Sequence, residues 1–221
     1  MSEPSPEADP TGSGLLAPER VLELRARLLA WYAAEARDLP WRRSDDPYAI
    51  WVSEAMLQQT QVATVIDYWY RFMQRFPTVG DLARADDEAL MGVWSGLGYY
   101  SRARNLRAAA KVVFERYGGH FPRHRHEALE LPGVGRYTAG AVLSIAYDLP
   151  EPLVDGNVAR VLSRRFGIWD DIKHGAESAW DRRDPSPVRR FLVTNVGVGS
   201  GYSDGRDLRS AVVRLIHQCS A

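Results

Sequence analysis

The sequence predicts an all-α fold, and three observations support this prediction. Between Leu15 and Phe166, apolar residues recur at the spacing of one buried helix face. Glycine and proline separate these stretches from one another. No segment alternates polar and apolar residues over the length of a strand. The first stretch carries Val21, Leu22, Leu24, Leu28, Leu29 and Trp31.

Further helices are expected in order along the chain. A long helix begins at Pro47, with Asp45 or Asp46 as its cap, and runs to Met73. The later helices are bounded by capping residues and glycines. They are expected from Asp86 to before Gly96, over 101–116 with a left-handed end at Gly118-Gly119, and over 124–131, 137–147 and 155–165. Beyond Ile168 the pattern weakens, and only 208–217 has a helical pattern.

Composition limits the class of protein. The 221 residues are 45% apolar, which is enough for a packed core, and 28 Lys and Arg balance 28 Asp and Glu. Overall charge therefore gives no indication of a polyanionic partner. The single cysteine, Cys219, excludes an internal disulfide framework. Without a membrane-spanning run or a signal-peptide pattern, we expect a cytoplasmic protein with a disordered tail over 1–14.

A glycine-rich turn, LPGVG at 131–135, joins two predicted helices. Gly133 and Gly135 permit unusual backbone angles, and the turn leaves amide N–H groups free just before a helix begins. With the positive end of the helix dipole and Arg136, these groups form a candidate phosphate site. The alternative is an ordinary turn between two helices.

The section between Leu97 and Arg136 is locally basic. Its acidic residues are only Glu115, Glu127 and Glu130. Such a distribution indicates a surface that follows a DNA backbone, although a solvated helix face is the alternative for any single arginine. The basic residues are Arg102, Arg104, Arg107, Lys111, Arg116, Arg123, Arg125 and Arg136.

Two carboxylates are candidates for acid and charge-stabilising roles. Glu54 belongs to the apolar stripe of the long helix, where burial favours the protonated form and a proton-donor role. It could instead lie at the edge of the stripe, paired with Arg42 or Arg43. Asp155 stands where a helix begins, so it is an N-cap candidate, and backbone N–H groups would keep it ionised. One protonated and one charged carboxyl group is the usual pair in glycosidic bond cleavage.

Polar and aromatic side chains follow the candidate acid. Gln58, Gln59, Thr60 and Gln61 can hydrogen-bond base edges that are left unpaired when a base is flipped. Leu97, Tyr99 and Tyr100 follow a glycine break and could wedge into a base stack. Packing into the core is the alternative for these residues.

Four segments resemble the MutY-type adenine DNA glycosylases of the helix-hairpin-helix, or endonuclease III, superfamily. They occur in family order over about Leu39 to Ile168. They are LPWRRSDDPYAIWVSEAMLQQTQVATV, WSGLGYYSRARNL, LPGVGRYTAGAVLSIAY and VDGNVARVLSRRFG. The resemblance implies a two-lobed helix-hairpin-helix DNA glycosylase fold, with a six-helix lobe over about 47–150. A second lobe would be formed from 15–46 and 151–221, with 15–168 as the glycosylase core and 169–221 as a divergent C-terminal segment.

The resemblance also implies roles for individual residues. Glu54 would protonate adenine at N7, and Asp155 would stabilise the sugar cation. Arg42 would contact the adenine, while Tyr137 and Asn157 would line the site.

For the DNA, the resemblance implies that side chains enter the base stack opposite or beside the flipped base. These are Gln59, Leu97 and Tyr99. The duplex would otherwise be held mainly through its phosphates.

One residue separates this sequence from lyase relatives, and two departures separate it from the usual family pattern. Lyase relatives carry a Schiff-base lysine after GVGR, where this sequence has Tyr137, so we expect base excision without strand cleavage. The family's 4Fe–4S cluster needs four cysteines that are absent here, so no cofactor is expected. Nothing in the sequence resembles the C-terminal domain that recognises 8-oxoguanine in the family.

The expected function is therefore excision of adenine mispaired with 8-oxoguanine or guanine. The expected partner is double-stranded DNA. The protein is expected to be a monomer that does not associate with membranes. Two alternatives stay open, a DNA-binding protein without catalysis and a glycosylase that removes thymine from G·T pairs.

Overall fold

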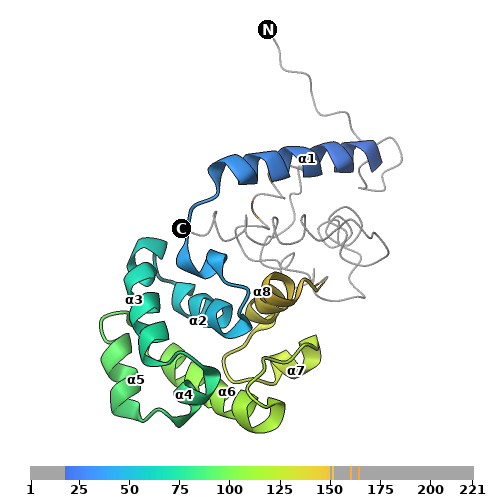
Figure 1. Ribbon diagram of the computed structural model, residues 1–221. Helices are drawn as coiled ribbons and strands as arrows, with labels where there is room; N and C mark the ends of the chain where they lie inside the picture. Colours follow the sequence, from blue (N-terminus) through green and yellow to red (C-terminus); the bar gives the residue numbers. More distant parts are fainter. Residues whose placement is uncertain (1–17, 150, 152–159, 161–163, 165–221) are drawn as a thin grey trace. The chain divides into compact units, whose positions relative to one another are not determined.

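The computed structural model describes residues 18–149, 151, 160 and 164 (Figure 1). These residues contain helices and no strand, which confirms the predicted all-α fold. Helix α1, Pro18–Glu35, belongs to one compact unit of the chain. The main unit begins at Ala36 and contains every other described helix. The tail 1–14 and the helices expected over 155–165 and 208–217 lie outside the described residues, Arg160 and Arg164 excepted.

The main unit has a short 3-10 helix and seven α-helices among its described residues. The 3-10 helix η1 is Pro40–Arg43. The α-helices are α2 Pro47–Leu57, α3 Val62–Arg75, α4 Val79–Arg84, α5 Asp87–Trp94, α6 Ser101–Tyr117, α7 Arg125–Leu129 and α8 Arg136–Tyr147. None of the described helices is long and apolar enough to cross a membrane.

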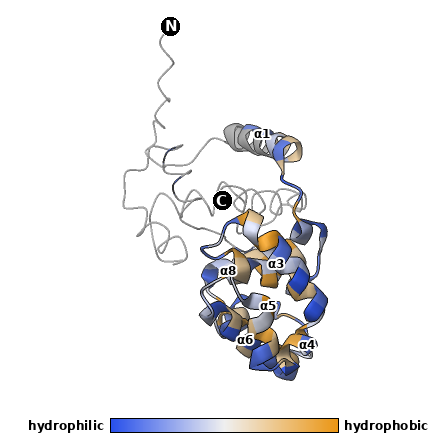
Figure 2. Ribbon diagram, turned by 90° about the vertical axis from the view of Figure 1, so that its left-hand side faces the viewer, coloured by the Kyte–Doolittle hydropathy of each residue, from blue (hydrophilic) through white to orange (hydrophobic). Residues whose placement is uncertain are grey.

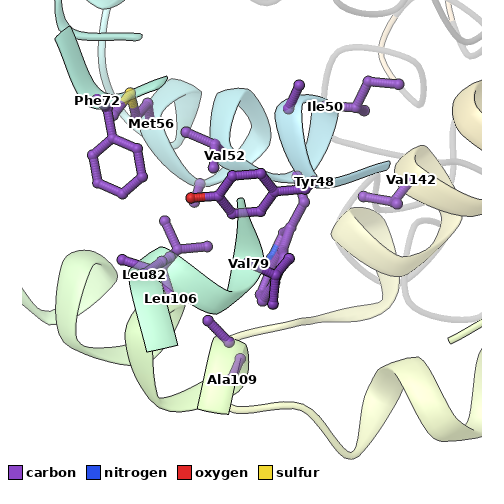
Figure 3. Close-up of a cluster of buried hydrophobic side chains, with 14 of the residues drawn as sticks. Tyr48, Ile50, Val52, Met56, Phe72, Val79, Leu82, Leu106, Ala109 and Val142 are labelled. Atoms are coloured by element: carbon purple, nitrogen blue, oxygen red, sulfur yellow. The ribbon is translucent and has the colours of Figure 1, made fainter. Parts of the chain in front are cut away.

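Helix α2 lies at the centre of the main unit, since it packs against α3, α6 and α8. Figure 3 shows Tyr48, Val52 and Met56 of α2 in a cluster with residues of α4 and α6, including Leu82 and Leu106. The Tyr48 hydroxyl donates to the Phe76 carbonyl oxygen at 3.0 Å, and burial raises the pKa of this phenol. The outer helices α3 and α6 carry both hydrophobic and hydrophilic residues, as expected for one buried and one exposed side (Figure 2).

The predicted long helix over 47–73 is wrong, because it is broken into α2 and α3 at residues 58–61. Gln59 has a φ of 57°, which no α-helix accommodates. At this end of the helix, the Arg102 side chain donates to the carbonyl oxygens of Ala55 and Met56, at 3.1 and 2.7 Å. These are C-terminal carbonyls that have no partner within α2.

Helix α4 was not expected from the apolar pattern, because it is only six residues long. It is defined by a capping box at its start. The Thr78 hydroxyl accepts from the Asp81 amide at 3.2 Å, and the Asp81 carboxylate accepts from the Thr78 amide at 3.1 Å. The Thr78 hydroxyl also donates to Asp81, which lowers the pKa of that carboxyl group.

The start of α2 depends on one capping carboxylate, so Asp46→Ala should destabilise the protein by about 1 kcal/mol. Asp46 accepts from the Tyr48 amide at 3.0 Å, which confirms Asp46 as the cap. Urea denaturation measures the effect, with Asp45→Ala as the matched control, since Asp45 is exposed and does not cap the helix. Equal losses for both variants would contradict the capping role.

Candidate active site

Glu54 lies inside the main unit, in the C-terminal half of α2. Its side chain is only 3% exposed, so the predicted burial is confirmed. Its neighbour Ser53 is also buried, and its hydroxyl donates to the Ile50 carbonyl oxygen at 2.7 Å. A carboxyl group in this position is costly to bury, which is typical of a residue kept for chemistry.

The alternative for Glu54 is a position at the edge of the apolar stripe of α2, paired with Arg42 or Arg43. Burial argues against an edge position, and Arg43 is engaged elsewhere. Its Nε donates to Asp38 at 2.8 Å. Arg42, the expected adenine contact, is half-buried, and its Nη1 donates to the Arg37 carbonyl oxygen at 2.9 Å.

Tyr137 lies in the first turn of α8, the helix that packs against α2. Its side chain is half-buried. Helix α8 has Gly135 as its N-cap, and no side chain caps its first amides. Arg136 is exposed at the same end. The start of α8 therefore has uncapped backbone N–H groups beside one cation, while the expected binding of a phosphate there stays a prediction.

The turn before α8 depends on Gly133. Its φ is 74°, and the Val134 amide donates to the Leu131 carbonyl oxygen at 3.1 Å. A Cβ atom at Gly133 would lie 2.7 Å from the Cβ of Asn105 on α6. Both the backbone angle and the close approach of α6 therefore require glycine at this position.

Gly133→Ala should lower the free energy of unfolding by more than the left-handed backbone alone would. Placing alanine in the left-handed region costs about 1–2 kcal/mol, and Asn105 would also have to move. Gly118→Ala is the matched control, because Gly118 has a φ of 61° with nothing near its Cβ position. Urea denaturation should give the larger loss for Gly133→Ala, and equal losses would show that the Asn105 contact is unimportant.

The polar run after Glu54 forms a loop rather than part of a helix. Gln58, Gln59 and Gln61 are exposed in this loop and are available to a ligand. Gln59 is one of three described non-glycine residues with a positive φ. The expectation that these glutamines follow one turn of a continuous helix is therefore corrected, while their expected contact with bases stays a prediction.

Leu97 and Tyr99, both expected to enter a base stack, have different environments. Leu97 is 6% exposed and belongs to the hydrophobic core, so the core-packing alternative holds for this residue. Tyr99 is 58% exposed and has a φ of 45°. Of these two residues, Tyr99 is the exposed one, and the exposed Tyr100 lies beside it in sequence.

The basic surface is smaller than the sequence predicted, because several arginines have structural partners. Arg102 is buried against backbone carbonyls, and burial lowers the pKa of its guanidinium. Arg107 donates to the Ala85 carbonyl oxygen at 3.0 Å and to Asp87 at 2.5 Å. Arg125 donates to Glu151, and Arg116 donates to Glu130. The exposed basic residues of this section are Arg104, Lys111, Arg116, Arg123 and Arg136.

Sequence reasoning missed the structural role of Arg102. Its position along α6 follows the same spacing as the surface arginines of that helix, so no sequence pattern distinguishes it.

Asp155 and Asn157, the other expected site residues, lie outside the described residues. In the described part of the chain, no group of three or more His, Cys, Asp or Glu residues could hold a metal ion.

Relatives with established names share high sequence identity with this chain. The rat (Rattus norvegicus) adenine DNA glycosylase is 56% identical over 160 residues, covering 68% of this chain and 31% of that protein. The human (Homo sapiens) adenine DNA glycosylase is 54% identical over 160 residues, covering 68% and 29%. The chain thus spans about a third of the length of these relatives.

Solved structures show the same fold. A thermostable thymine-DNA glycosylase superposes with a TM-score of 0.71 at 25% identity, covering 92% of this chain and 87% of that one. Endonuclease III in a non-covalent DNA complex gives a TM-score of 0.62 at 23% identity, covering 88% and 85%. Residues 52–181 match the model of the HhH-GPD superfamily base excision DNA repair protein. With its helical fold and its turn before α8, the chain belongs to the HhH-GPD superfamily.

Proposed function

We propose that this chain is an adenine DNA glycosylase acting on adenine opposite 8-oxoguanine or guanine in double-stranded DNA. The observation that carries the proposal is the buried carboxyl of Glu54, which lies within residues 52–181, the segment that matches the HhH-GPD family model. The mammalian and the bacterial relatives, the latter from Buchnera at 43% identity, carry the same name.

The proposed chemistry uses two carboxyl groups. Glu54 donates a proton to the flipped adenine, so that the base leaves with the electron pair of the N-glycosidic bond as a neutral molecule. The sugar becomes an oxocarbenium-like cation, which the Asp155 carboxylate stabilises until water adds to it and loses a proton. Both groups are required at the same step, so loss of either slows release of the base.

Base release is proposed to leave the DNA strand intact. Strand cleavage by lyase relatives proceeds through a lysine imine, and the position after Gly135-Arg136 is Tyr137 here. A phenol cannot form that imine. Abasic sites should therefore accumulate until alkali cleaves them.

The proposed reaction has no step that requires an iron–sulfur cluster. Such clusters are held by four thiolates, and this 221-residue sequence has one cysteine, Cys219. The residues present do not fit the cluster. Binding and chemistry are instead assigned to protein side chains and to the backbone amides at the start of α8.

A second candidate function is thymine excision from G·T pairs. The thermostable thymine-DNA glycosylase superposes with a TM-score of 0.71, which is the observation that favours it. Its 25% identity to this chain is far below the 56% of the rat adenine DNA glycosylase, so adenine is the preferred substrate.

The test compares base release from three duplexes, A opposite 8-oxoguanine, A opposite G and T opposite G, with and without alkali. Asp155→Asn is assayed beside the wild type. The proposal expects free adenine from the first two duplexes, strand breaks only after alkali, and little release by the variant. Free thymine from the third duplex alone would establish the second candidate. Duplex binding without release of either base would establish a non-catalytic DNA-binding protein.

A further inference from the structure

Two exposed segments of the main unit hold strained residues. Gln59, in the segment 58–61, has a φ of 57°, and Tyr99, in the segment 95–100, has a φ of 45°. Both side chains are exposed. Non-glycine residues avoid this backbone region, and they persist there only when the surrounding structure holds them. The third such described residue, Asp148, is different because it ends α8.

The Arg102 side chain bonds both segments. On one side, its Nη1 donates to the Gln58 carbonyl oxygen at 2.5 Å, and its Nη2 donates to the Thr60 hydroxyl at 3.1 Å. Gln58 and Thr60 are the two residues that flank Gln59. The same Nη1 also bonds the last turn of α2, the helix that carries Glu54.

On the other side, Arg102 bonds the backbone just before Tyr99. Its Nη2 donates to the carbonyl oxygens of Leu97 and Gly98, both at 3.3 Å. Its Cζ lies 5.3 Å from the centre of the Tyr99 ring, within the range of a cation–π contact. The two segments are therefore joined through one guanidinium, although they are about forty residues apart in sequence.

Two further bonds hold the 95–100 segment against the core. The Trp94 Nε1 donates to the Gly98 carbonyl oxygen at 3.1 Å. The Tyr68 hydroxyl donates to the Ser95 carbonyl oxygen at 2.8 Å. These bonds hold the backbone that leads into Tyr99.

A guanidinium suits this junction better than an ammonium group. Its planar fork has five N–H donors in fixed directions, so it can serve acceptors on two sides at once. A lysine ammonium is compact, with three rotatable donors on a flexible stem. Arg102→Lys therefore keeps the charge while losing the bridge.

We propose that Arg102 is a positioning residue that holds Gln59 and Tyr99 in a fixed relation, so that both enter a DNA duplex together. The inference rests on the proposed function, because it takes duplex DNA as the ligand. Inserting side chains between bases requires unstacking, and segments whose backbone is held in place beforehand lose less conformational entropy on binding. Arg102 touches neither the base nor the sugar in this account, and it acts through the two segments.

The experiment compares Arg102→Lys with Arg107→Lys. Arg107 is the matched control because it lies on α6, its side chain is 17% exposed, and it also bonds a loop carbonyl oxygen and a carboxylate. It bonds neither the 58–61 nor the 95–100 segment. Insertion is read from 2-aminopurine placed next to the target nucleotide, since its fluorescence rises when stacking is lost. A 2′-fluoro target nucleotide slows hydrolysis during this measurement.

At saturating protein, Arg102→Lys should lose the fluorescence rise and slow single-turnover release by up to about 100-fold. Arg107→Lys should keep both the fluorescence rise and the wild-type rate of base release. This difference between the two variants should remain even if urea denaturation gives them the same stability. A fluorescence rise and rate equal to those of Arg107→Lys would overturn the inference. A wild type that neither binds the duplex nor raises the fluorescence would instead overturn the proposed function.

If circular dichroism shows that Arg102→Lys is unfolded, Thr60→Val decides the question. This change removes one acceptor of Arg102 at a half-buried loop position and leaves the core intact. A reduced fluorescence rise at unchanged stability would support the bridge. An undiminished rise would overturn it.

Discussion

Replacing Glu54 by glutamine is expected to slow adenine release by about 10²- to 10⁴-fold, the range typical of losing a general acid. Glutamine matches glutamate in size, so the buried position on α2 stays filled. What disappears is the acidic proton that lets adenine leave as a neutral base. The loss should appear in single-turnover kinetics at saturating enzyme, where binding does not limit the rate.

The matched control is Glu115→Gln, a change of the same kind at an exposed position of α6. This variant should release adenine at the wild-type rate. Both variants should bind the mispaired duplex with similar affinity. An unaltered rate for Glu54→Gln would show that the proton comes from another group, and it would remove the proposed mechanism.

Truncating Phe72 is expected to have the largest effect on stability, with a loss of about 3–5 kcal/mol for Phe72→Ala. Phe72 is fully buried on α3, and its ring packs edge-to-face against Phe76 at 5.2 Å and Trp94 at 5.9 Å between centroids. Figure 3 shows it beside Met56 of α2. The cavity left behind would weaken the packing that supports both α2 and the start of the 95–100 segment.

The comparison for Phe72 is Phe114→Ala, because the Phe114 ring is 44% exposed on α6. Its truncation should cost about 1 kcal/mol or less. Urea denaturation gives both free energies of unfolding. A loss below about 1 kcal/mol for Phe72→Ala would mean that the cluster in Figure 3 is not the stabilising core.

The sequence predicted helix ends well where a local residue determines them. Gly118 ends α6 with a left-handed backbone, and Asp86 caps the start of α5, both as expected from residue type. The expected turn before α8 also occurs, since glycine and proline act on their own backbone. Local chemistry is sufficient for these features.

Features set by distant contacts were not predictable. The run Gln58 to Gln61 contains no glycine or proline, so the sequence gives no sign that α2 stops there. At the break, a guanidinium from α6 bonds the carbonyl oxygens of the last turn of α2. For the same reason, Arg102 was counted with the surface cations, and Leu97 was assigned to a base stack although it packs in the core. The role of Asp155 stays a prediction from its position at a helix start and from the resemblance, and the role of Asn157 a prediction from the resemblance alone.

Whether the wild-type chain is an adenine DNA glycosylase is decided by measuring the release of free adenine in a single turnover on a duplex with adenine opposite 8-oxoguanine. Free adenine and an alkali-labile site on the adenine strand are expected, and both should be lost in Glu54→Gln. A folded wild-type protein that binds this duplex and releases no adenine would contradict the proposed function.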